Sequence, residues 1–257
     1  MDFTLKTYHN LLTFLKQENY NFITFEEFCE GRVEDKFIIL RHDIDLKAEN
    51  SLKTATIEHE LGIKASYYFR IVPQSNQPHI IKQIAELGHE IGYHYEDLSL
   101  FKGNENEAIT HFEKQLACFR QYYPVKTICM HGSPTSKIDN RSIWKTYNYR
   151  DFGIIGEPYF DIDFNQVFYL TDTGRCWDGE KYSVRDKVQS SFTKKFHTTE
   201  QIIDALQTNS LPNQMMITTH PQRWTDNLFF WMKELLLQNG KNILKYFYGI
   251  YYALGTK

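Results

Sequence analysis

The chain has 257 residues, a net charge of −3 and a pI near 6.4, which suits one α/β domain and argues against an extended basic surface for nucleic acid. Its four Cys residues lie far apart, without a Cys-x-x-Cys pair, and charged residues interrupt the first twenty positions. This pattern predicts reduced thiols, no signal peptide and a cytoplasmic protein without an integral membrane segment.

Predicted helices and strands alternate along most of the chain. Apolar residues at helical spacing, with Gly or Pro at segment ends, predict helices over 4–17, 47–61, 78–87, 105–122, 140–147, 198–208 and 226–237. Short apolar runs predict strands over 35–46, 65–72, 89–94, 126–130, 152–155, 167–171 and 215–219. Strand-then-helix order implies a parallel sheet with right-handed crossovers.

The number of these units predicts an α/β fold with one domain, a distorted or incomplete (β/α) barrel. Its core is expected over about 36–225, with a helical cover over 1–35 and aromatic helices over 226–257. The segment 243–254 has five Tyr or Phe residues and one Lys, so we expect it to be packed. The barrel's outer layer, a dimer contact and, last, a membrane surface are the alternatives for what it packs against.

Two carboxylates follow the buried strand that begins near Asp35. Because strand side chains alternate with a period of two, Asp43 and Asp45 are expected on one face, with His42 on the other. Two acids in one small volume favour either a metal site or a tuned acid and base. The alternative is that Asp45 caps the helix that begins near Ala48 while Asp43 is a solvated loop residue.

Polar side chains follow the ends of several predicted strands in the same way. Barrels of this class place their chemistry at the carboxyl ends of the strands, so these residues are expected at one rim. They are Asp43, Asp45, His94, His131, Asp172 and His220.

Four segments together resemble the polysaccharide deacetylases of carbohydrate esterase family 4, the NodB-like group. They are His-Asp-Ile-Asp at 42–45, Gly-His-Glu-Ile-Gly-Tyr-His at 88–94, Asp172 with Trp177, and Thr-Thr-His-Pro at 218–221. The resemblance covers roughly residues 36–225 and is nearest to the branch linked to bacterial surface polysaccharides such as O-antigen or capsule. It implies a distorted barrel, a divalent metal, commonly zinc, and hydrolysis of acetyl groups on sugars.

Carried over to matching positions, the resemblance makes Asp43 the general base, Asp45 and His94 metal ligands, and His220 the general acid. The family's further His ligand corresponds to Leu98 here, and Leu cannot bind a metal. Three alternatives for the third ligand remain. His131 is the first choice because it ends a separate strand, and Glu96 and Asp97 are the others. The segment His131-Gly132-Ser133-Pro134 replaces the family's Arg-Pro, which helps orient the catalytic Asp.

The residues expected to bind substrate are Asp172, Arg175, Trp177 and Trp224. Asp172 could also hold the imidazole of His220, and the two Trp rings could stack on a sugar or equally belong to the core. The predicted function is a metal-dependent hydrolase that removes an acetyl group from a sugar of a surface-polysaccharide precursor. The alternatives are a catalytically silent sugar-binding or scaffold protein with a degenerate metal site, and a metal hydrolase of another ester or amide. A homo-oligomer is possible.

Overall fold

The sheet at the centre of the molecule consists of parallel strands in the order β5-β4-β3-β2-β7-β6, with β1 beside the first half of β2. This computed structural model describes residues 1–132, 136–179 and 187–255, with side chains described as far as Ile243. The strands are β1 (Asn21–Ile23), β2 (Phe37–Ile44), β3 (Ser66–Phe69), β4 (Glu90–Tyr95), β5 (Ile128–Met130), β6 (Phe168–Thr171) and β7 (Gln214–Thr219). The sheet curls but stays open between β5 and β6, which confirms the predicted incomplete (β/α) barrel.

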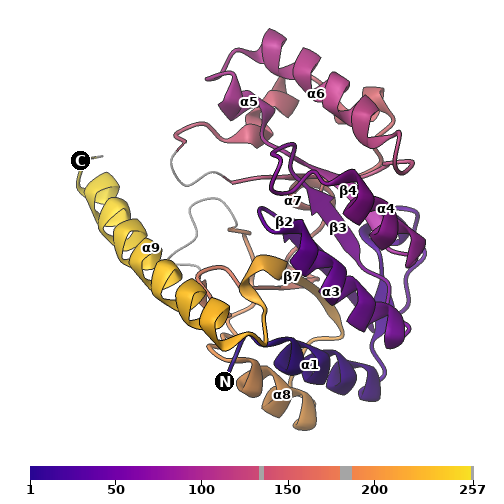
Figure 1. Ribbon diagram of the computed structural model, residues 1–257, viewed down its shortest axis with the longest axis vertical. Coiled ribbons are helices and arrows are strands. Elements are labelled where there is room, and N and C mark those ends of the chain that lie inside the picture. The colour runs from indigo at the N-terminus through magenta and orange to yellow at the C-terminus, as the bar shows by residue number, and fades with distance from the viewer. Residues whose placement is uncertain (133–135, 180–186, 256–257) are drawn as a thin grey trace.

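Helices flank this sheet, and several of them form one layer (Figure 1). In that layer α8 contacts α1, α1 contacts α3, and α3 contacts α4. The helices are α1 (Leu5–Gln17), α2 (Phe25–Cys29), α3 (Ala48–Glu60), α4 (Pro78–Glu86), α5 (Asp97–Leu100), α6 (Glu105–Phe119), α7 (Pro158–Asp161), α8 (Thr199–Gln207) and α9 (Leu228–Gly255). Short 3-10 helices occur at η1 (Asn140–Lys145), η2 (Tyr149–Phe152) and η4 (Pro221–Arg223).

Strand β2 is buried on both faces, and its side chains alternate between two parts of the core. Ile38 and Leu40 pack in the larger core cluster, which also holds residues of α1 and α3. Phe37 and Ile39 pack in a second cluster on the other face. The alternation places Asp43 on the face of Phe37 and Ile39, which is the face that carries the candidate site.

Three sequence-based predictions of local structure were wrong. The strand expected over 152–155 is absent, because η2 ends at Gly153 with a φ of +71° and only an isolated bridge from Gly156 follows. The three-residue strand β1 was missed, since it is too short to show a periodic pattern. The last helix does not end near residue 237 but continues through Gly240 as α9. In the described part of the chain, no helix combines the length and apolarity needed to cross a membrane.

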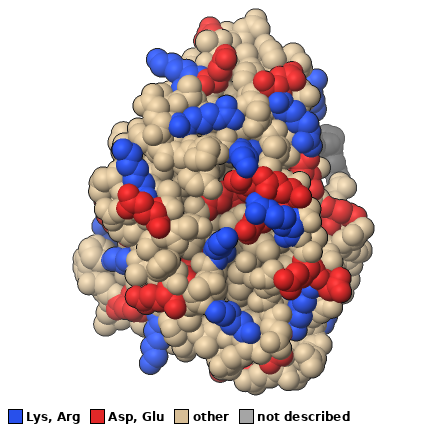
Figure 2. All heavy atoms as spheres, turned by 90° about the vertical axis from the view of Figure 1, so that its right-hand side faces the viewer, with Lys and Arg blue, Asp and Glu red and all other residues tan. Residues whose placement is uncertain are grey.

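The distribution of charged side chains on the surface indicates which charged partners the protein could bind. Acidic and basic side chains are intermixed over the face shown in Figure 2. A nucleic-acid-binding surface would instead gather Lys and Arg on one side. The intermixed charges on this face agree with the small net charge of the chain.

A buried acid at the start of β4 makes stability depend on pH. Glu90 accepts hydrogen bonds from Ser66 Oγ at 2.6 Å, from the backbone N–H of Glu26 at 3.0 Å and from Thr127 Oγ1. Burial raises the pKa of Glu90 from 4.5 to about 7, so the folded state keeps its proton to a higher pH than the unfolded chain. The stability that this group contributes is complete below pH 4.5 and is lost as the pH rises through about 7.

Glu90→Gln should remove this loss because the amide is neutral at every pH. Its oxygen can accept from Ser66 and its NH₂ can donate to Thr127 Oγ1. We expect the variant to have a higher unfolding free energy than the wild type. This difference between the two proteins should be about 2 kcal/mol larger at pH 8 than at pH 5, as urea denaturation can measure. Glu86→Gln, at an exposed position of α4, controls for the change in net charge. Equal gains at the two pH values would contradict the assignment.

Candidate metal centre and catalytic site

The two acids that follow β2 face the same imidazole. His94 Nε2 lies 3.8 Å from Asp43 Oδ2 and 3.7 Å from Asp45 Oδ1, so the predicted shared face is confirmed. The ring of His42 points to the other face, where it contacts Glu58 at 2.9 Å. The capping alternative was wrong, because the N-cap residue of α3 is Lys47 and no side chain caps that helix.

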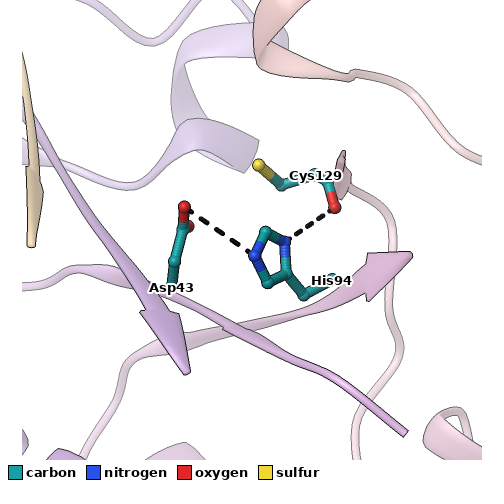
Figure 3. A group of neighbouring side chains, drawn as sticks. All are labelled: Asp43, His94 and Cys129. Atoms are coloured by element: carbon teal, nitrogen blue, oxygen red, sulfur yellow. Dashed lines mark hydrogen bonds and ion pairs between the residues drawn. The ribbon is translucent and has the colours of Figure 1, made fainter. Parts of the chain in front are cut away.

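His94 is held in one tautomer by the neighbouring strand. Its Nδ1 lies 2.9 Å from the carbonyl oxygen of Cys129, and a carbonyl only accepts, so Nδ1 carries the proton (Figure 3). Nε2 then presents a lone pair toward Asp45, and burial lowers the pKa of His94 to about 4, which keeps the ring neutral. Gly92 lets β4 approach β3 closely, since a Cβ there would lie 2.3 Å from the ring of Tyr68.

His131 completes a triangle of donor atoms. Its backbone N–H donates to Tyr95 O at 2.8 Å, which continues the pairing of β5 with β4. Its Nδ1 lies 3.2 Å from Asp45 Oδ1 and 3.3 Å from His94 Nε2, and the third side of the triangle is the 3.7 Å between the latter two atoms. Ligands of a tetrahedral zinc ion, at roughly 2.0–2.1 Å from the metal, are about 3.4 Å apart.

The chemistry of this donor set also fits a divalent cation. Asp45 Oδ1 is buried and makes no hydrogen bond to any described residue, although it faces both imidazoles. Burial opposes ionisation of Asp45, but the neighbouring His131, above all, lowers its pKa well below the usual range. One carboxylate and two imidazoles with open lone pairs are a set that zinc prefers.

Polar side chains contact two of the three ligands, His131 and Asp45, on the side away from the triangle. Glu96 Oε2 lies 3.8 Å from His131 Nε2, and Arg70 binds both Glu96 oxygens at 2.8 Å. Gln222 Nε2 donates to Asp45 Oδ2 at 3.2 Å. Such contacts fix the orientation of metal ligands and the tautomer of a ligating His. Sequence reasoning missed Arg70 and Gln222, which come from other strand ends and carry no motif.

The structure also places the alternatives to His131. Leu98 is buried against Ala108 and Ile143, away from the donor atoms. Asp97 accepts hydrogen bonds from Tyr93 at 2.8 Å and His111 at 2.6 Å. Glu96 lies behind His131 and does not join the triangle. Of the described residues near this edge, the only other set with donor atoms close enough for a metal is Asp43, His94 and Cys129.

Asp43 is paired with a buried arginine from its own strand. Arg41 Nε donates to Asp43 Oδ1 at 2.8 Å and Arg41 Nη2 donates to Oδ2 at 2.6 Å. Burial alone would raise the pKa of Asp43, but the charge and hydrogen bonds of Arg41 lower it below its usual range. Because both oxygens are engaged, Asp43 is a weaker metal ligand than Asp45. Arg41 is thus the residue that orients Asp43 in the structure. Of the segment 131–134 expected in that role, Ser133 and Pro134 lie outside the described residues. In the sequence, the position of Arg41 two residues before Asp43 is what could have indicated this pairing.

His220 faces the site from β7's end and is oriented by Asp172. Asp172 Oδ1 accepts from His220 Nδ1 and Arg223 Nη1, both at 2.6 Å, and its Oδ2 accepts from Trp224 Nε1 at 2.8 Å. His220 Nε2 lies 4.0 Å from Asp45 Oδ2. Asp172 is buried with these donors around it, so it orients His220, the second role predicted for it, and is not exposed for substrate binding.

Trp177 and Trp224 are core residues, which corrects their prediction as sugar platforms. Trp224 is fully buried, and Trp177 is 4% exposed with its Nε1 donating to Thr199 Oγ1 at 2.9 Å. Phe3 packs against both indole rings. Neither ring offers a free face on which a sugar could stack.

Arg175 is likewise corrected from substrate binding to a structural contact. It is buried, with its Nη1 donating to Trp231 O at 2.8 Å and its guanidinium 4.4 Å from the centre of the Trp231 ring. The sequence placed it near a strand end, but its side chain joins the loop after β6 to α9. It therefore fixes α9 to the body.

Comparison with known proteins yields distant structural matches. No family model and no curated protein matches the chain. A family 4 carbohydrate esterase from Streptomyces lividans in complex with acetate matches at 13% identity over 82% of this chain and 91% of that one, with a TM-score of 0.41. A CE4 family pseudoenzyme from Bacillus anthracis matches at 12% identity over 81% of this chain and 62% of that one, with a TM-score of 0.46.

A mutant of the same pseudoenzyme with restored enzymatic activity matches at 12% identity and a TM-score of 0.46, over 81% of this chain and 64% of that one. The chain thus spans less than two thirds of the length of these two proteins. Similarities this distant do not say what the chain binds or hydrolyses.

Proposed function

We propose that the protein is a divalent-metal-dependent hydrolase that removes an acetyl group from a carbohydrate. The observation that carries the proposal is the triangle of Asp45 Oδ1, His94 Nε2 and His131 Nδ1, with sides of 3.2, 3.3 and 3.7 Å. The motif resemblance adds the carbohydrate and the acetyl group. It also suggests a precursor of a surface polysaccharide as substrate and a cytoplasmic reaction.

Each residue of the site has a role in this reaction. Asp45, His94 and His131 would hold the metal, which supplies a Lewis acid for the acetyl oxygen and acidifies water. Asp43, kept ionised by Arg41, is placed to accept a proton from the attacking water. His220 is placed to give a proton from Nε2 to the departing amine or alcohol, while the contact of its Nδ1 with Asp172 fixes the ring.

A catalytically silent scaffold is the second candidate, and one observation favours it. Both oxygens of Asp43 are bound by Arg41, and a carboxylate with a lowered pKa is a weaker general base. A silent protein would keep the fold and bind sugar without turnover. Acetate release from a panel of N- and O-acetylated sugars separates the two candidates.

Asp43→Asn tests the proposed base. We expect the variant to keep its metal and to lose turnover by about a hundredfold or more, because Asn cannot accept the proton. Metal content by elemental analysis and acetate release by a coupled assay are the two measurements. Asp45→Ala is the matched control and should lose both metal and turnover. If Asp43→Asn lost its metal and Asp45→Ala kept it, the roles of the two acids would be reversed.

A further inference from the structure

Helix α9 turns a stripe of large apolar side chains away from the rest of the molecule. The outer stripe consists of Leu228, Phe229, Met232, Leu236 and Ile243, which are between 51% and 69% exposed. In Figure 1 the helix runs along one side of the chain, with its outer side clear of the other elements. Apolar surface of this kind on a monomer, on the order of several hundred Å², marks an interaction site.

The inner side of α9 combines Trp231, whose ring packs on Arg175, with several polar side chains. Gln238 and Asn242 are buried there, with Asn242 Nδ2 donating to Gly174 O at 2.8 Å and its Oδ1 accepting from Gln238 at 2.7 Å. Glu234 forms an ion pair with Lys47 at 3.7 Å. Polar contacts therefore attach the helix to its own chain, and the apolar side is left for another partner.

The spacing of the outer stripe is that of a helix–helix seam. Phe229, Met232, Leu236, Asn239 and Ile243 alternate by three and four residues. The sequence continues the same spacing with Tyr246, Ile250 and Ala253, whose side chains lie outside the described residues. Phe230 and Leu237, which are 51% and 50% exposed, flank these positions. Spacing by three and four residues fits one facing helix and is that of a coiled coil.

From these observations we infer that the occupant of the outer stripe is α9 of a second copy of this chain. Asn239 is exposed within the stripe and makes no side-chain hydrogen bond in the described part of the molecule. An amide both donates and accepts, so two copies of Asn239 can pair across a two-fold axis, as polar residues in such seams do.

A lipid surface fits the helix less well than a second copy does. Between residues 228 and 255 the helix has three Lys and one Glu, a net charge of +2, which gives little attraction to anionic lipid. Burying Asn239 among acyl chains would leave its amide without a partner. The inner contacts of α9 reach the loops after β2 and β6 through Lys47 and Gly174.

Sedimentation of the full chain over a concentration series tests this inference. We expect a dimer for the wild type, and we expect Leu236→Glu to weaken dimerisation by about a hundredfold or more, since it puts a charge into the seam. Lys241→Glu places the same carboxylate away from the stripe and should remain a dimer. Leu236 is exposed, so the variant should fold, as circular dichroism can verify.

Cross-linking and vesicle flotation decide between the possible occupants. Asn239→Cys should form an intermolecular disulfide on oxidation, whereas Lys241→Cys, on the side of the helix opposite the stripe, should not. A monomeric wild type would overturn the inference. A second result would also overturn it. If both proteins sedimented as monomers, and the wild type floated with phosphatidylglycerol vesicles while Leu236→Glu did not, the occupant of the stripe would be lipid.

Discussion

Replacing His131 with Ala is expected to weaken metal affinity by more than about a hundredfold, beyond the loss typical of residues that only orient a ligand. The physical reason is that Nδ1 of His131 supplies one corner of the three-atom set, and two remaining donors cannot hold the ion. Competition between the protein and a zinc chelator of known affinity measures the change. Glu96→Gln is the matched control, expected to lose only about tenfold to a hundredfold because it acts through His131.

Leu98→His should not restore the metal in the His131→Ala protein. A His at position 98 would be buried against Ala108 and Ile143, in a cluster that contains none of the donor residues. The motif resemblance alone would make position 98 a ligand position. If His131→Ala kept full zinc occupancy at chelator concentrations that strip Asp45→Ala, then His131 would be a substrate contact and Glu96 the better third ligand.

Removing Arg41 is expected to have the largest effect on stability. Arg41→Met should lower the free energy of unfolding at neutral pH by about 3–5 kcal/mol, because it leaves the ionised Asp43 buried without its partner. Urea denaturation measures the loss. The double variant Arg41→Met/Asp43→Asn should recover a large part of it, since no uncompensated charge remains.

The pairing of Arg41 with Asp43 can be separated from packing by completing the double-mutant cycle. The single variant Asp43→Asn is the fourth protein of the cycle. The coupling energy separates the contribution of the ion pair from that of the volume of the Arg side chain. Additive effects of the two substitutions would mean that the contact at 2.6 Å adds nothing to stability, contrary to this account.

The site residues at the strand ends could be predicted because the local order of apolar and polar residues determines where they lie. An apolar run followed by acids specifies a buried parallel strand with its polar residues at the carboxyl edge, and period two put Asp43 and Asp45 together. The same reasoning brought His94, His131 and His220 to that edge. All of these meet within a few ångströms in the structure.

The partners of these residues could not be predicted in the same way, since they depend on long-range packing. Arg70 reaches Glu96 across 26 positions, and Gln222 reaches Asp45 across 177. Trp177 and Trp224 follow strand ends as catalytic residues do, but their rings turn into the core because Phe3 from the N-terminal segment covers them. The outward apolar side of α9 likewise becomes visible only once the polar inner contacts are known.

The position of a bound zinc ion in crystals tests the central claim most directly. Anomalous diffraction at the zinc edge should show one peak within bonding distance of Asp45 Oδ1, His94 Nε2 and His131 Nδ1, at roughly 2.0–2.1 Å from each. A peak instead between Asp43, His94 and Cys129, or no peak near His94 in crystals grown with zinc, would contradict the assignment of the metal centre.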